Sequence, residues 1–66
     1  MNRNDRALEA LEQAEDDLSE AATDLTLAMV AAGNTRLGRD ARVLAEAVEA
    51  EIVAVAAVLH RYRPRR

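Results

Sequence analysis

The sequence predicts an all-α protein: an antiparallel two-helix hairpin that assembles into a four-helix bundle as a homodimer. Three observations lead to this prediction. Residues 5–32 contain neither proline nor glycine, the pair Gly33 and Asn34 follows, and apolar residues recur at heptad spacing on both sides of that pair. A chain of 66 residues permits one small domain, which buries only about 60% of its unfolded surface. Because it has no cysteine, disulfides and thiolate zinc sites are excluded, and oligomerisation is the expected source of additional stability.

The first helix is predicted over residues 5–32. Asn2 or Asn4 can cap its start, and Asp5 suits the positive end of the helix dipole. One row of the expected seam repeats every seven residues and is mostly leucine: Leu11, Leu18, Leu25 and Ala32. An offset row is alanine: Ala7, Ala14, Ala21 and Ala28. Leucines packing over alanine gaps would let two helices approach closely. Three flanking residues widen the apolar stripe: Leu8, Ala22 and Met29.

The second helix is predicted over residues 36–63, after a turn at 33–35, with Thr35 as its cap and Pro64 at its end. An alternative start lies at Asp40. Helical spacing already holds in its first part, at Leu37, Ala41, Leu44 and Val48. The later seam alternates steps of three and four: Ala45, Val48, Ile52, Val55, Leu59 and Tyr62. The apolar run 52–59 could instead form a buried strand, but such a strand would have no partner in this chain.

A lone hairpin would leave further apolar side chains in water: Leu27, Val30, Val53, Ala54, Ala57 and Val58. We expect this surplus mainly in the last three turns of the second helix, where it would form either a contact between copies or a site for another protein. The residues predicted for the oligomer interface are Leu11, Leu18, Leu25, Met29, Leu44, Val48, Ile52, Val55 and Leu59.

Candidate chemistry is sparse. The acidic residues of the first helix indicate a solvated face rather than a metal site, because His60 is the only histidine and no Glu-x-x-His pair exists. His60 itself suits the negative end of the helix dipole. No catalytic, metal-binding or cofactor-binding residues are predicted, and the chain is not expected to be an enzyme.

The C-terminal segment, with its basic tail at 64–66, has two interpretations. Its residues Arg61, Tyr62, Arg63, Arg65 and Arg66 could contact nucleic acid through phosphate binding and stacking. They could equally pair with the acidic N-terminal half of the first helix, or contact an acidic partner. The net charge of −3 favours pairing over a general polyanion binder.

The expected function is therefore contact with itself and with another protein, as a small cytoplasmic adaptor or modulator. The alternative is a dimeric nucleic-acid-associated regulator that uses the arginine-rich C-terminus. No secretory signal is expected behind Met1, and the longest apolar run, 52–59, is too short to span a membrane.

In length, hairpin form and these leucine and alanine heptads, the chain resembles the Rop-type plasmid copy-number regulators, which are four-helix-bundle dimers that bind RNA hairpins. The resemblance implies architecture only. Rop-like RNA binding uses a polar and basic face of the first helix, whereas the first helix here is acidic.

Overall fold

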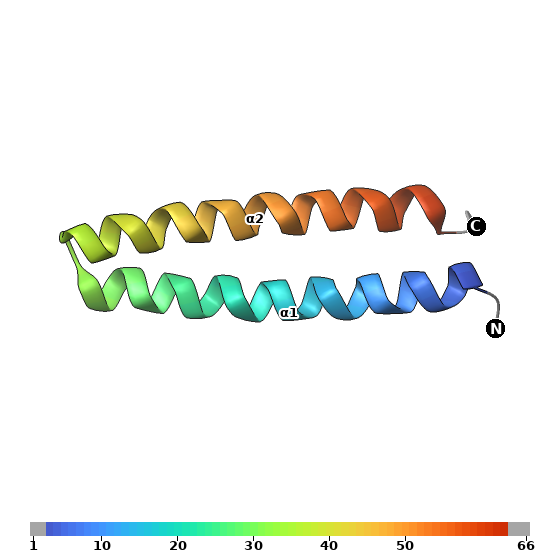
Figure 1. Cartoon of the computed structure of the whole chain (residues 1–66), viewed down its shortest axis with the longest axis horizontal. Coiled ribbons are helices and arrows are strands. Elements are labelled where there is room, and N and C mark those ends of the chain that lie inside the picture. Colours follow the sequence, from blue (N-terminus) through green and yellow to red (C-terminus); the bar gives the residue numbers. More distant parts are fainter. Residues whose placement is uncertain (1–2, 64–66) are drawn as a thin grey trace.

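A computed structural model of the chain describes residues 3–63 as two helices that pack side by side (Figure 1). Helix α1 is Arg3–Ala32 and helix α2 is Arg36–Tyr62. They run antiparallel, so the start of α1 lies beside the end of α2 (Figure 1), in a molecule measuring 48 × 17 × 17 Å. The predicted all-helical, two-helix architecture is confirmed.

The helix ends refine the sequence predictions. Because α1 begins at Arg3, Asn4 lies inside its first turn and does not cap it, and Asn2 lies outside the described residues. Helix α2 begins at Arg36 rather than Asp40. It is continuous through residues 52–59, so the strand alternative is wrong. The predicted basic tail at 64–66 lies outside the described residues.

The turn is held by a left-handed glycine and by one threonine hydroxyl. Gly33 has φ of +62° and donates its N–H to the Met29 carbonyl oxygen at 3.0 Å, which ends α1. The Thr35 hydroxyl donates to the Ala32 carbonyl oxygen at 3.0 Å and accepts from the Gly38 N–H at 3.1 Å. Thr35 is thus the predicted N-cap of α2, and its side chain also ties that cap to the last turn of α1.

Gly38 allows α2 to approach the turn closely. It is buried, and a Cβ atom at this position would overlap the Gly33 carbonyl oxygen. Only a residue without a side chain therefore fits where the first turn of α2 meets the end of α1. This contact determines which side of α2 faces α1.

The seam between the helices consists of the residues that each helix turns toward the other. In α2 the seam residues are buried or half-buried: Gly38, Ala41, Ala45, Val48, Ile52, Val55 and Leu59. In α1 they are all half-buried: Leu8, Leu11, Glu15, Leu18, Ala22, Leu25, Met29 and Ala32. The predicted leucine row and the later seam of α2 lie here. Tyr62, however, is 61% exposed.

Two parts of the predicted seam are wrong. In α1 the second row is formed mainly by the residues one position later: Ala14 and Ala21 of the predicted alanine row are half-buried, but Ala7 and Ala28 are exposed. In the first part of α2, Leu37 and Leu44 point away from α1, being 70% and 55% exposed. The close approach at Gly38 explains the second difference, because it puts residues 38, 41 and 45 in the seam.

Replacing Gly38 with alanine tests the close approach. Gly→Ala inside a helix normally stabilises it by about 1 kcal/mol. Here the added methyl group collides with the Gly33 carbonyl, so we expect Gly38→Ala to lower the free energy of unfolding by about 1 to 3 kcal/mol. Thermal unfolding followed by circular dichroism at one fixed protein concentration measures it. A higher melting temperature for the variant would contradict the account.

Glu15 is the one charged residue in the seam of α1. It is half-buried, and its carboxylate makes no hydrogen bond or ion pair with any other residue of the described range 3–63. We expect Glu15→Leu to raise the free energy of unfolding by about 1 to 2 kcal/mol, because it adds buried apolar surface and removes a partly desolvated charge. The control is Glu20→Leu on the exposed side of the same helix, which should stay within about 0.5 kcal/mol.

Candidate functional site

One long side of the hairpin carries small and aliphatic residues, and we call it the alanine-row face. Its residues repeat at intervals of seven along each helix: Ala7, Ala14, Ala21 and Ala28 from α1, with Leu37, Leu44, Glu51 and Val58 from α2. Ala14, Ala21 and Val58 are half-buried at the edge of the seam, and the others are exposed. Seven of these eight residues are apolar.

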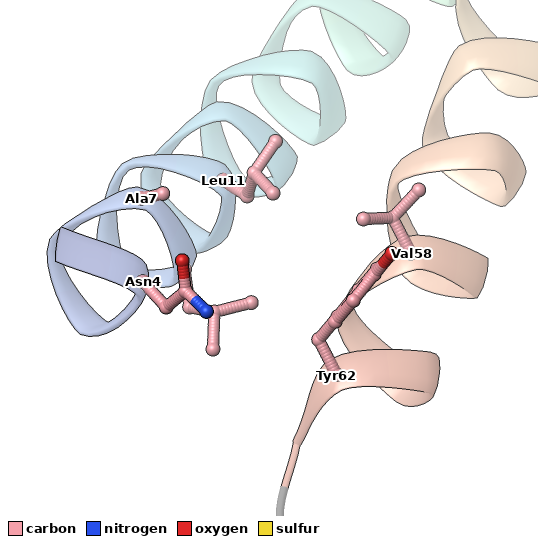
Figure 2. Close-up of a pocket in the computed structure, with 6 residues that line it drawn as sticks. Asn4, Ala7, Leu11, Val58 and Tyr62 are labelled. Atoms are coloured by element: carbon pink, nitrogen blue, oxygen red, sulfur yellow. The ribbon is translucent and has the colours of Figure 1, made fainter.

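The end of the hairpin opposite the turn, which we call the open end, shows that the row of α1 and the row of α2 lie on the same side. A shallow apolar pocket there is lined by residues of both helices: Asn4, Ala7, Leu8, Leu11, Val58 and Tyr62. Figure 2 shows Asn4, Ala7 and Leu11 on α1 facing Val58 and Tyr62 across this pocket. Ala7 and Val58, which begin and end the two rows, therefore flank the same hollow.

The opposite side of the seam, which we call the polar face, is lined mainly by hydrogen-bonding and charged groups. Its residues also repeat every seven positions: Glu12, Ser19 and Thr26 from α1, with Arg42, Glu49, Ala56 and Arg63 from α2. Thr26, Arg42 and Glu49 line one hollow, and Arg63 contacts Glu12. The two long sides of the hairpin thus differ in chemistry.

The large exposed apolar residues are distributed differently from the prediction. In the described residues they are Leu27, Val30, Leu37, Val43, Leu44, Val53 and Tyr62. Leu27, Val30 and Val53 are exposed as predicted, but Val58 is half-buried. The expected concentration in the last three turns of α2 holds only in part: Ala54 and Ala57 are also exposed there as predicted, but three large residues, Leu37, Val43 and Leu44, are exposed in the first three turns. The register at Gly38, which turns Leu37 and Leu44 outward, accounts for this.

Most residues predicted for the oligomer interface lie in the seam within one chain. Leu59 is buried there, and the half-buried ones are Leu11, Leu18, Leu25, Met29, Val48, Ile52 and Val55. Leu44 is the exception, since it is exposed on the alanine-row face. The structure therefore accounts for the seam residues without a second copy and leaves Leu44 available for one.

The C-terminal basic residues are brought to the acidic start of α1. The Arg63 guanidinium donates a hydrogen bond of 2.6 Å to the Glu12 carboxylate, and both side chains are about half exposed. Arg61 and Tyr62 are exposed at the end of α2, whereas Arg65 and Arg66 lie outside the described residues. Arg63 therefore pairs with the acidic half of α1, as one of the two interpretations of this segment predicted.

The other candidate groups are on the surface. His60 is exposed in the last turn of α2, where a cation complements the helix dipole. Among residues 3–63 no group of histidine and acidic side chains converges as a metal site would require. Neither of the two helices is long and apolar enough to cross a membrane.

The turn end of the hairpin carries a basic cluster that was not predicted from the sequence. Arg36, Arg39 and Arg42 are exposed in the first two turns of α2, and the last acidic residue of α1 is Asp24, about two turns before the turn. The sequence does contain these three arginines at helical spacing, but the acidic residue Asp40 lies between them and makes the pattern less evident. The hairpin therefore has a basic turn end and an acidic middle.

No protein-family model, curated protein or solved structure matches the chain.

The ion pair between Arg63 and Glu12 should add little stability, because both side chains are half exposed. A double-mutant cycle with Arg63→Gln and Glu12→Gln should give a coupling energy of about 0.2 to 1 kcal/mol. The coupling should also shrink in about 1 M salt, which screens exposed charges. A coupling energy above about 2 kcal/mol would contradict the half-exposed positions of these two side chains.

Proposed function

We propose that the protein is a small, non-enzymatic, self-associating helical protein of the cytoplasm that acts through protein contacts, as an adaptor or modulator of a larger partner. The observation that carries the proposal is its excess surface. The chain exposes 5512 Å², whereas a compact monomer of 7.2 kDa would expose about 4,100 Å². The excess of roughly 1,400 Å² exceeds the area that one partner contributes to a standard interface.

The small core supports the same proposal. The described residues include only three buried apolar side chains, Ala41, Ala45 and Leu59, and none is fully buried. Chains of this size need a disulfide, a metal, association or unusually dense helix packing to offset the entropy of ordering, and this chain has no cysteine. Association with a second hairpin into a four-helix bundle would cover the exposed aliphatic residues.

The acidic outer side of α1 is the surface proposed for a larger partner. Its exposed carboxylates follow one another along the helix: Glu9, Asp16, Asp17, Glu20 and Asp24. Such a strip attracts a basic protein surface and raises the rate of encounter. A cytoplasmic location fits the lack of cysteine, because small domains of oxidising compartments are typically rich in disulfides.

Sedimentation equilibrium tests the proposed self-association. We expect a dimer at roughly 10 μM protein, which corresponds to a dissociation constant in or below the micromolar range. Helix content should fall on dilution, because unfolding is then linked to dissociation. A folded monomer at about 100 μM would contradict the proposal.

A further inference from the structure

The alanine-row face has the composition of an interhelical contact, although one chain covers it only in part, at Ala14, Ala21 and Val58. Alanine at every seventh position lets another helix approach closely, and aliphatic residues at the same spacing supply the groups that would fill the gaps. The polar face, by contrast, holds Glu12, Arg42, Glu49 and Arg63. The two sides of the seam are therefore not equivalent, and only one of them is suited to burial.

The face also has the size that a dimer needs. The hairpin is 48 Å long and 17 Å wide, so one long side has a footprint on the order of 800 Å², which is the area that one partner buries in a standard interface. A second copy of this chain presents the same length and the same row spacing.

The heights of the two rows along the hairpin show how they would interdigitate. Gly38 lies against Gly33 and Ala32, and the two helices run antiparallel away from that contact (Figure 1). Counting equal steps along both helices from this contact places Leu44 between Ala21 and Ala28. The same count places Val58 between Ala7 and Ala14. Each of these aliphatic residues of α2 therefore lies level with a position between two alanines of α1.

Glu51 decides between the two symmetric ways of stacking this face on itself. It lies two residues, or about 3 Å, from the midpoint of α2. If the copies pointed in opposite directions, their Glu51 carboxylates would meet near the two-fold axis, and alanine rows would face each other. If the copies point in the same direction, each Glu51 faces the gap between Ala14 and Ala21 of the other copy, and Leu44 faces the gap between Ala21 and Ala28. Only the second arrangement separates the like charges and sets large residues against small ones.

We infer that the alanine-row face binds the same face of a second copy, with the two turn ends together. This inference rests on the proposed self-association and adds the surface, the occupant and the orientation. The polar face and the acidic outer side of α1 then stay exposed in the dimer.

Paired substitutions at adjacent residues test the surface. Leu44→Glu puts a charge on the alanine-row face and Val43→Glu puts one on the exposed outer side of α2, where both wild-type residues are more than half exposed. Ala28→Glu and Leu27→Glu are the matched pair in α1. We expect Leu44→Glu and Ala28→Glu to raise the dissociation constant of the dimer about 100-fold or more, because each buries an unpaired charge. The two control variants should change it less than about threefold.

These measurements distinguish a failure of the proposed self-association from a wrong assignment of the face. If the wild-type chain is a monomer, the proposed self-association fails. If the wild type is a dimer and the four variants dimerise equally, or the control variants dissociate instead, the self-association holds and the assignment of the face is overturned. Circular dichroism shows whether each variant is still helical. Where helix content has fallen, the dissociation constants are compared at a higher protein concentration, at which the variant still forms some dimer.

A distance measurement tests the orientation. The chain has no cysteine, so Asn34→Cys gives one site at the turn for a nitroxide spin label. With the turn ends together, the two labels of a dimer should lie within about 30 Å, because neighbouring helices of a bundle lie roughly 8 to 10 Å apart. Copies that point in opposite directions would separate the labels by most of the 48 Å length. A dominant distance above about 40 Å would overturn the orientation.

Discussion

The contact between Gly38 and the Gly33 carbonyl is the constraint on which the rest of the hairpin depends. At the turn, Gly38 of α2 faces the end of α1. Steps of three and four along the helix from Gly38 then place these residues against α1: 41, 45, 48, 52, 55 and 59. Leu37 and Leu44 are then turned out of the seam. A rotation of α2 by one residue would bury those two leucines and expose Ala41 and Ala45. One missing side chain thus decides which apolar residues form the core and which remain for another contact.

The sequence predicted the architecture well because the signals for it are local. The positive φ of Gly33 and the capping hydroxyl of Thr35 were expected from residue type alone. The leucine row repeated often enough to identify the face that α1 turns to its partner. Each of these features depends on a few neighbouring residues, so no knowledge of the rest of the fold was needed.

The details of the seam depended on contacts that the sequence does not display. Two rows of α1 repeat every seven residues one position apart: the alanines were predicted for the seam, and Leu8, Ala22 and Met29 of the other row only for its flank. Nothing in the sequence marked Gly38 as a position of close approach between the helices. Both errors have one physical cause: the rotation of each helix about its axis is determined where the helices touch. For the same reason the exposure of Leu37 and Leu44 in the first part of α2 was not predicted.

Placing the alanine row outside the seam changes what the leucine and alanine pattern means. If both rows of α1 had faced α2, its alanines would have been buried within the hairpin. Few small apolar residues of α1 would then have remained exposed for a second partner. In the structure the leucine row and Met29 face α2, while Ala7 and Ala28 remain exposed. A helix with apolar residues on two adjacent sides is suited to a bundle of four rather than a pair. The charges agree with this division, because Glu12, Arg63, Arg42 and Glu49 lie on the other side of the seam, where they would keep contact with water in the proposed dimer.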